Sequence, residues 1–284
     1  MASQPLRLLI IGAHPDDPDT GAGGLAALYS RLGHQVKMVS VTNGDAGHHE
    51  MGGAPLARRR RAEAAAAGRC VGAEYITLDN HDGALMPTLD VRHQLIALIR
   101  EFRPDLMTVH RPNDYHPDHR YTAHLVQDAS YLLTVPNVVS HVPHLRSMPV
   151  IVHPWDHFQR PYPFSPNVVV NIDAVIEQKI DALHCHTSQM YEWLPYNGGY
   201  LDQVPADPDQ RRAWLRELRG PRFRTIADLY RTMLVEAYGE EQGKQVEFAE
   251  AFEVCEYGAP LTAENRQRLF PFFHPGNDSG PALV

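Results

Sequence analysis

The sequence of 284 residues lacks any apolar run long enough to cross a membrane. Its apolar runs, such as residues 8–11 and 168–170, fall far short of the roughly 20 residues that a membrane span needs. Residues 1–7 also lack the basic region followed by an apolar one that marks a secretory leader. We therefore expect a cytoplasmic protein without a membrane span.

Cysteine is scarce, and positive charge is in deficit. Cys70, Cys185 and Cys255 lie far apart and form no CxxC pair, so they predict no disulfide framework and suit a reducing compartment. The 26 lysines and arginines face 34 aspartates and glutamates, which argues against a nucleic-acid partner because such binding needs a basic face. The one dense basic cluster, Arg58–Arg61, lies in a helical stretch, where we interpret it as solvated surface with at most one functional arginine.

The first 110 residues alternate between strand and helix patterns. Continuous apolar runs such as LRLLII are typical of strands that are buried on both faces, and helical stretches separate them. Repeated βαβ units of this kind predict an α/β fold with a Rossmann-like, mostly parallel sheet flanked by helices. The expected strands cover residues 6–11, 35–41, 74–78 and 105–110, and the expected helices cover 23–32, 56–71 and 89–102.

The pattern changes beyond Pro136, where frequent prolines break any long element. We expect residues 1–200 to form one catalytic domain and residues 201–284 to form a C-terminal helical extension and tail that pack on it. The features expected in this half are a loop-rich wall at 136–166, a strand at 168–172, a helix at 174–190, two helices within 207–240, and a tail with the apolar patch LFPFF at 269–273.

Histidine is unusually frequent, with 17 residues. Ligands of parallel sheets bind beyond the carboxyl ends of the strands, and the segments expected there are rich in histidine and aspartate: IGAHPDD, TNGDAGHH, DNHDG and HRPNDYHPDH. A dinucleotide fingerprint, G-x-G-x-x-G, would begin at Gly12, but that register has His14 and Asp17 at the other glycine positions. An anionic cofactor is therefore disfavoured, and a cation is favoured.

The histidines and aspartates of these segments favour a metal site. His14 and Asp17 are three residues apart in a tight turn and can bind one ion, which leaves a third ligand to be found. His116 and His119 begin a predicted helix at the end of another strand, so both can face the same cleft. Two histidines and an aspartate with one open position are typical of a catalytic zinc site.

The motifs AHPDD (13–17), followed by GAGG, and HPDHR (116–120) together resemble the PIG-L/LmbE family of metal-dependent N-acetyl-sugar deacetylases. The resemblance extends from Leu6 to about Gln189. It implies that His14, Asp17 and His119 are the metal ligands, with zinc as the expected ion and other divalent ions admitted by the same ligands. It also implies that Asp16 is the general base and that His116 stabilises the oxyanion and protonates the departing amine.

The resemblance also implies a substrate site and an assembly. Arg60 stands in the substrate-contacting place, Asp82 lines the sugar pocket, and His186 belongs to an H-x-S-Q segment near the site. The implied substrate is a small N-acetylglucosamine-type sugar or glycoconjugate. Relatives are often trimers or hexamers, and LFPFF would be an exposed apolar patch on a monomer, so we expect a homo-oligomer.

Three other functions compete with the deacetylase. A hydrolase of another amide or ester could use the same scaffold, because fold and metal do not fix the substrate. A carbohydrate- or metal-binding protein could keep the ligands without catalysis, although it would have no use for Asp16. A nucleotide-binding oxidoreductase is disfavoured by the altered fingerprint.

Several residues near these motifs are open to more than one interpretation. His48 and His49 are interpreted as loop residues, and His110 as a core residue or a support for the ligands. An aromatic group could stack on a sugar or could serve core or subunit packing; it consists of Tyr191, Trp193, Tyr196 and Tyr200.

Overall fold

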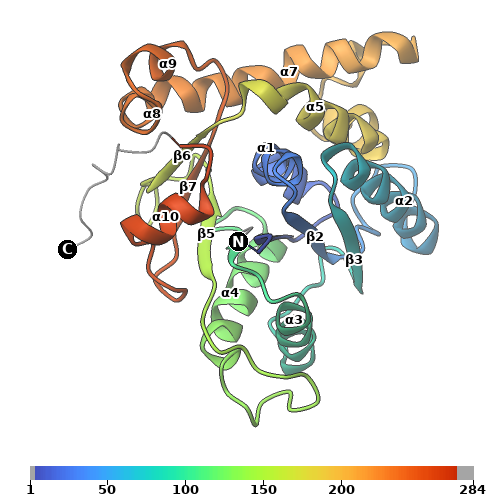
Figure 1. Ribbon diagram of the computed structural model, residues 1–284. Coiled ribbons are helices and arrows are strands. Elements are labelled where there is room, and N and C mark those ends of the chain that lie inside the picture. The colour runs from blue at the N-terminus through green and yellow to red at the C-terminus, as the bar shows by residue number, and fades with distance from the viewer. Residues whose placement is uncertain (1–3, 274–284) are drawn as a thin grey trace.

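The N-terminal part of the chain forms the βαβ repeats that the sequence predicts. The computed structural model describes residues 4–273 and contains a seven-stranded sheet in the order β3-β2-β1-β4-β5-β7-β6 (Figure 1). Strands β1 to β5 run parallel in their pairings, which confirms the Rossmann-like, mostly parallel sheet. The strands are β1 (Arg7–Gly12), β2 (Gln35–Thr42), β3 (Glu74–Asn80), β4 (Leu106–Thr108), β5 (Val150–Pro154), β6 (Val168–Asn171) and β7 (Ala249–Val254).

Helices cover both faces of the sheet. In Figure 1, α1, α2 and α5 lie on one face, and α3 and α4 lie on the other. Alternate residues of β1 serve the two layers: Leu8 and Ile10 pack with the first group, and Leu9 and Ile11 pack with the second. The helices are α1 (Asp17–Arg31), α2 (Gly53–Val71), α3 (Leu89–Phe102), α4 (Pro117–Leu132), α5 (Ile176–Cys185), α6 (Leu194–Asn197), α7 (Pro208–Leu229), α8 (Arg231–Tyr238), α9 (Glu240–Gln245) and α10 (Ala263–Leu269).

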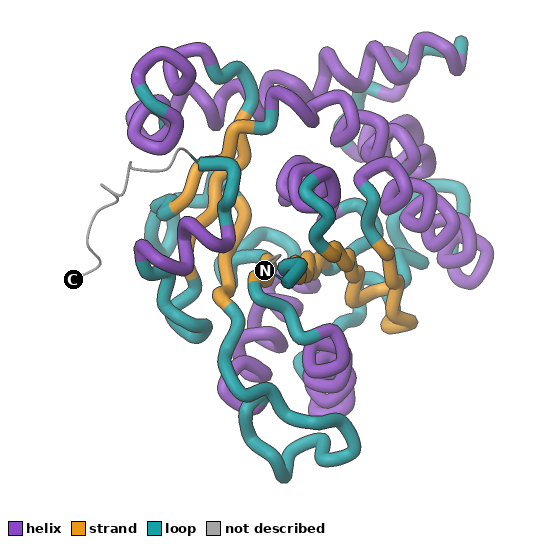
Figure 2. The backbone as a smooth tube through the Cα atoms, viewed as in Figure 1, coloured by secondary structure: helices purple, strands orange, loops and turns teal. Residues whose placement is uncertain are grey.

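Two strands add to those expected from the sequence. β5 lies within the predicted proline-rich wall, although the segment between α4 and β5 is loop, as expected (Figure 2). β7 comes from beyond residue 200 and lies between β5 and β6, antiparallel to both. The last part of the chain therefore supplies an interior strand of the sheet as well as helices.

Helix α1 is interrupted, and a carboxylate from β7 accepts the backbone N–H groups that follow the interruption. Ala22 has a non-helical conformation (φ −147°, ψ 22°). Both carboxylate oxygens of Glu250 accept backbone N–H groups beyond this break, from Gly24 (2.7 Å) and Leu25 (2.8 Å). The fully buried Lys179 Nζ lies 2.5 Å from Glu250 and also donates to the Thr20 carbonyl (2.9 Å). Two distant segments thus complete the buried helix of the first βαβ unit.

The apolar patch LFPFF packs on its own chain. Leu269 and Phe270 are fully buried in the core that α1, α5 and β7 share, and Phe272 and Phe273 pack against it. The patch is therefore not the exposed surface on which the expectation of a homo-oligomer partly rested, and the oligomeric state stays a prediction.

The helix expected over residues 174–190 is shorter than predicted. α5 ends at Cys185, and a π-helical turn, η2 (Gln189–Trp193), follows it. The two helices expected within 207–240 are present as α7 and α8. Across residues 4–273, none of the helices combines the length and the apolar character that a membrane crossing requires.

Candidate active site

The candidate site lies where the sheet order reverses, beyond the carboxyl ends of β1 and β4. This is the position at which open α/β sheets bind ligands. The chain leaves β1 in a tight turn in which the N–H groups of Asp16 (2.9 Å) and Asp17 (3.2 Å) both donate to the His14 carbonyl. Gly12 permits the turn, because a Cβ at this position would lie 2.5 Å from the Cβ of Asp17.

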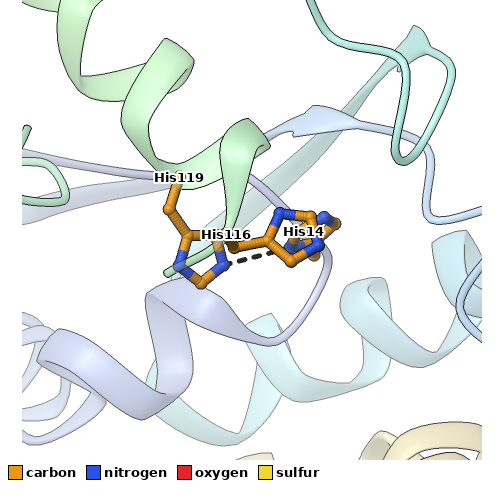
Figure 3. Close-up of side chains that lie close together, drawn as sticks. All are labelled: His14, His116 and His119. Atoms are coloured by element: carbon orange, nitrogen blue, oxygen red, sulfur yellow. Dashed lines mark hydrogen bonds between the residues drawn. The ribbon is translucent and has the colours of Figure 1, made fainter. Parts of the chain in front are cut away.

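Three side chains form a small triangle at this turn. His14 Nδ1 lies 3.3 Å from Asp17 Oδ2 and 3.3 Å from His119 Nε2, and His119 Nε2 lies 3.4 Å from Asp17 Oδ2. Figure 3 shows His14, His116 and His119 gathered at the start of α4, with the His14–His119 contact dashed. His14, Asp17 and His119 are the three residues that the sequence predicted to act together, and their Nδ1, Oδ2 and Nε2 atoms lie close enough to one another to hold one metal ion.

Carboxylates flank the outer nitrogens of both histidines of the triangle. His14 Nε2 lies 3.0 Å from Asp82 and 3.3 Å from Asp118, and His119 Nδ1 lies 3.1 Å from Asp114. A carboxylate behind a histidine holds the proton on the outer nitrogen and leaves the inner lone pair free. Burial by itself lowers the pKa of His14, but hydrogen bonds to Asp118, Asp17 and Asp82 raise it well above its usual value.

Asp16 is held by a residue of α2. Its Oδ1 accepts a hydrogen bond from Arg60 (3.0 Å), whose guanidinium is 2% exposed and also lies 3.6 Å from Asp82. Burial raises the pKa of Asp16, and the charge of Arg60 partly opposes that rise. Gly44, with a φ of 71°, makes room for the guanidinium, because a Cβ there would lie 2.6 Å from an Arg60 nitrogen.

His116 lies beside the triangle as the N-cap of α4. Its Nδ1 accepts the backbone N–H of Asp118 (3.1 Å), and its ring meets the edge of His14 with centroids 4.6 Å apart. Burial, together with the charges of His14 and His119, lowers the pKa of His116. Because Nδ1 accepts, the proton of neutral His116 lies on Nε2.

His186 belongs to the H-x-S-Q segment that was expected near the site, and it lies deep in the fold. Its side chain is fully buried, and its Nε2 lies 2.9 Å from Asp19 of α1. The reason is that α5 ends at Cys185, so the H-x-S-Q segment turns inward. The next residues, Thr187 and Ser188, hydrogen-bond to Glu63 of α2 (2.8 and 2.6 Å).

The structure adds residues that the sequence did not assign. His110 stacks on His119 with centroids 4.1 Å apart, and its Nε2 accepts the Ala13 N–H (3.1 Å) while lying 3.3 Å from Asp17. His110, Asp17 and His119 also form a group whose ligand atoms lie close enough together to hold a metal ion. Asp114 and Asp118 lie in the same histidine- and aspartate-rich segment, which was the only signal for them.

An aromatic stack stands next to the site. His49 stacks on Tyr196 (centroids 4.1 Å apart) and on His48 (4.7 Å), and Tyr196 faces Trp193 (6.1 Å). His48 lies in a loop, as interpreted from the sequence, and its Nε2 pairs with Glu192 (2.8 Å). The stack adjoins the site through Gly47, at which a Cβ would lie 3.2 Å from Asp82 and 3.7 Å from Trp193.

Comparisons with known proteins agree with this geometry. Residues 9–130 match the family described as PIG-L, GlcNAc-PI de-N-acetylase. Diacetylchitobiose deacetylase of Thermococcus kodakarensis is 30% identical over 207 residues, which cover 67% of this chain and 74% of that protein. 4-oxalmesaconate hydratase of Pseudomonas putida is 26% identical over 196 residues, which cover 66% and 76%.

A solved structure extends the similarity to most of the fold. N,N'-diacetylchitobiose deacetylase from Pyrococcus horikoshii superposes with a TM-score of 0.67 at 26% identity, over 89% of this chain and 85% of that one. The motifs at 13–17 and 116–120 both lie within residues 9–130, which match the family. The chain therefore belongs to the PIG-L family.

Proposed function

We propose that this protein is a metal-dependent N-deacetylase that removes the acetyl group from an N-acetylglucosamine-type sugar or glycoconjugate. The observation that carries the proposal is the triangle of His14, Asp17 and His119 beside the non-ligating Asp16. The deacetylases among the relatives supply the reaction class. A protein that only binds a metal or a carbohydrate would have no use for a carboxylate held next to the ligands.

The triangle fits a tetrahedral divalent ion. Ligand atoms at about 2.0–2.1 Å from Zn²⁺ lie roughly 3.4 Å from one another, and the three separations here are 3.3, 3.3 and 3.4 Å. His14, Asp17 and His119 would therefore hold the ion, and Zn²⁺ is the ion we propose, with Fe²⁺ and Mn²⁺ also compatible with these ligands. When bound, such an ion polarises an amide carbonyl and lowers the pKa of water toward about 7.

Two residues of the chain would move the protons. Asp16 would accept a proton from water, with Arg60 fixing one of its oxygens so that the other can face the reacting water. In its protonated form, His116 would donate from Nε2, first as a hydrogen bond to the carbonyl oxygen and then as a proton to the departing nitrogen, which leaves the ring neutral. The carbon–nitrogen bond breaks, and the products are acetate and the free amino sugar.

The remaining predicted residues would position the reaction. Arg60 would act on Asp16 more directly than on the substrate, because its guanidinium is buried against that carboxylate. Asp82 would orient His14 and line the pocket. His186 would support α1 from behind through Asp19.

Addition of water to a carbon–carbon double bond is the second candidate reaction, because one relative is a hydratase. The charges at the site favour the deacetylase. Recognition of an anionic substrate uses unpaired cations, whereas Arg60 is paired with Asp16 and Asp82, and Arg59 is paired with Glu192 and Glu63. An uncharged amide is the better match for such a site.

The decisive experiment is a screen of the zinc-loaded protein against N-acetylated sugars, both free and linked to an aglycone. Acetate and primary amine are measured together, and we expect both to appear in equal amounts with at least one substrate. Asp16→Asn is the matched inactive control. Release from none of the sugars would contradict the proposal and favour a different amide or ester, or the hydratase reaction if an unsaturated acid is consumed instead.

A further inference from the structure

Two cysteines that are far apart in the sequence meet in the fold. The sulfur atoms of Cys70 and Cys185 lie 3.7 Å apart, although 115 residues separate them in the chain. Cys70 is in the last turn of α2, and Cys185 is the last residue of α5. Both are free thiols with partly buried side chains. The pair therefore lies between α2, which carries Arg60, and the end of α5, which directly precedes His186.

The third cysteine is excluded from this pair by the sheet. Cys70 and Cys185 pack against the core that α1, α2 and α5 share, whereas Cys255 is buried in the core beneath α3 and α4. Cys255 instead lies 3.8 Å from Gln127. The chain thus contains its own matched control, a buried thiol without a cysteine neighbour.

The local contacts keep the two thiols close together. Gln178 of α5 donates a hydrogen bond from its Nε2 to the Cys70 carbonyl (3.3 Å), which fixes the end of α2 against α5. The Cys70 thiol itself donates to the Ala66 carbonyl (3.6 Å). A disulfide bond is about 2.05 Å long, so the sulfurs would need to approach by roughly 1.6 Å, a distance that side-chain rotation can supply.

We propose that Cys70 and Cys185 are a modification site at which hydrogen peroxide forms a reversible intramolecular disulfide. Peroxide first oxidises one thiol to a sulfenic acid and releases one water. The second thiol then attacks that sulfur, forms the sulfur–sulfur bond and releases a second water. Two thiols and one peroxide thus give one disulfide and two waters, and a dithiol reductant reverses the change.

The environment of Cys185 disfavours its thiolate. Burial and the neighbouring Cys70 together raise the pKa of the Cys185 thiol to about 12. Because the thiolate is the reactive form, peroxide oxidises Cys185 slowly.

The bond would link α2 to the end of α5, next to the candidate site. α2 carries Arg60 and Glu63, and Cys185 directly precedes His186 and the residues that bind Glu63. Crosslinks that close long loops stabilise a fold by restricting the unfolded chain. We expect the oxidised protein to melt about 5–10 °C higher than the reduced one.

The test uses the full-length reduced protein and a small excess of hydrogen peroxide. Thiols are counted after denaturation, and the number should fall from three to one, with the intact mass lower by two hydrogens. Digestion without reductant should yield one linked peptide containing Cys70 and Cys185. Cys255→Ser should lose both of its thiols, whereas Cys70→Ser and Cys185→Ser should form no internal link and show no rise in melting temperature.

Other products would overturn the inference. These are a linked peptide that contains Cys255, disulfide-linked dimers, or oxidation of Cys70 to a sulfinic acid while Cys185 stays free. Melting of the reduced serine variants shows whether they are folded, and the peptide map of the unaltered protein decides the matter even if they are not. The inference does not depend on which reaction the protein catalyses.

Discussion

Asp114 Oδ2 lies 3.1 Å from the Nδ1 atom of His119, on the side of the ring opposite Asp17. A carboxylate at this distance favours the histidine proton on Nδ1, so that the Nε2 lone pair faces the triangle. Hydrogen bonding and charge from His119 in turn lower the pKa of Asp114, against the effect of burial.

Asp114→Asn should weaken metal binding without abolishing it. The amide still contacts the ring but no longer favours the tautomer that the site needs, and loss of such a partner typically reduces metal affinity by about 10–100-fold. Competition with a chelator measures the affinity, and activity should recover at a higher metal concentration. Asp128→Asn, which removes an exposed carboxylate near Arg92, is the control, and equal weakening in both variants would refute the role of Asp114.

Asp16→Asn should keep the metal and lose most of the turnover. An amide cannot accept the water proton, and loss of a general base typically lowers the rate by about 10²–10⁴-fold. Metal content and turnover are measured on the same samples. His14→Ala should lose the metal, and if Asp16→Asn loses it equally, Asp16 is a ligand and not the base.

Lys179→Met should destabilise the fold strongly. The substitution leaves the Glu250 carboxylate buried without its cation, and breaking a buried pair in this way costs about 3–5 kcal/mol of unfolding free energy. Lys244→Met breaks an exposed pair with Glu240 and should cost less than about 1 kcal/mol. Similar denaturation midpoints for the two variants would contradict the importance of the buried pair.

The free energy of unfolding should fall as the pH is lowered, because of His153 in β5. Burial lowers the pKa of this side chain from 6.5 to about 4, although its Nδ1 donates to the Val109 carbonyl (3.0 Å). The unfolded chain therefore binds a proton near pH 6.5 that the folded chain binds only near pH 4. The stability that neutral His153 contributes is complete above pH 6.5 and is lost as pH falls from there toward 4.

The comparison with His153→Gln isolates this effect. Glutamine can still donate to Val109 but does not titrate. Between about pH 7 and pH 5, the unmodified protein should lose roughly 2 kcal/mol more than the variant, as measured by urea unfolding at each pH. Parallel losses would show that His153 is not the group responsible.

The parallel half of the sheet and the triangle follow from local patterns. β1 to β4 were each predicted from the sequence, and His14 and His119 lie in the segments that follow β1 and β4, so their convergence could be predicted from strand order. β5 and β7 could not be predicted in this way, because they are short, and the partners of β7 lie about 80 to 100 residues earlier in the chain. The burial of His186 could not be predicted from the sequence either. A motif gives the position of a residue in the chain but not the point at which a helix such as α5 ends.

Contacts between distant loops could not be predicted from the sequence, for a related reason. Asp118 accepts the backbone N–H of Gly83 (2.7 Å), and His48 pairs with Glu192, a residue 144 positions away. No local pattern joins such residues, because their meeting depends on how the elements between them pack. The Cys70–Cys185 contact across α2 and α5 belongs to the same class.

The place of Glu250 has a consequence for the growing chain. A ribosome synthesises α1 long before β7. The amides of Gly24 and Leu25 and the ammonium of Lys179 therefore have no Glu250 carboxylate to bind until more than two hundred residues have followed the start of α1. The first βαβ repeats cannot reach their final packing while the chain is still short. Folding is therefore completed late, when β7 enters between β5 and β6, and a nascent chain halted before residue 250 would keep α1 open and accessible to chaperones.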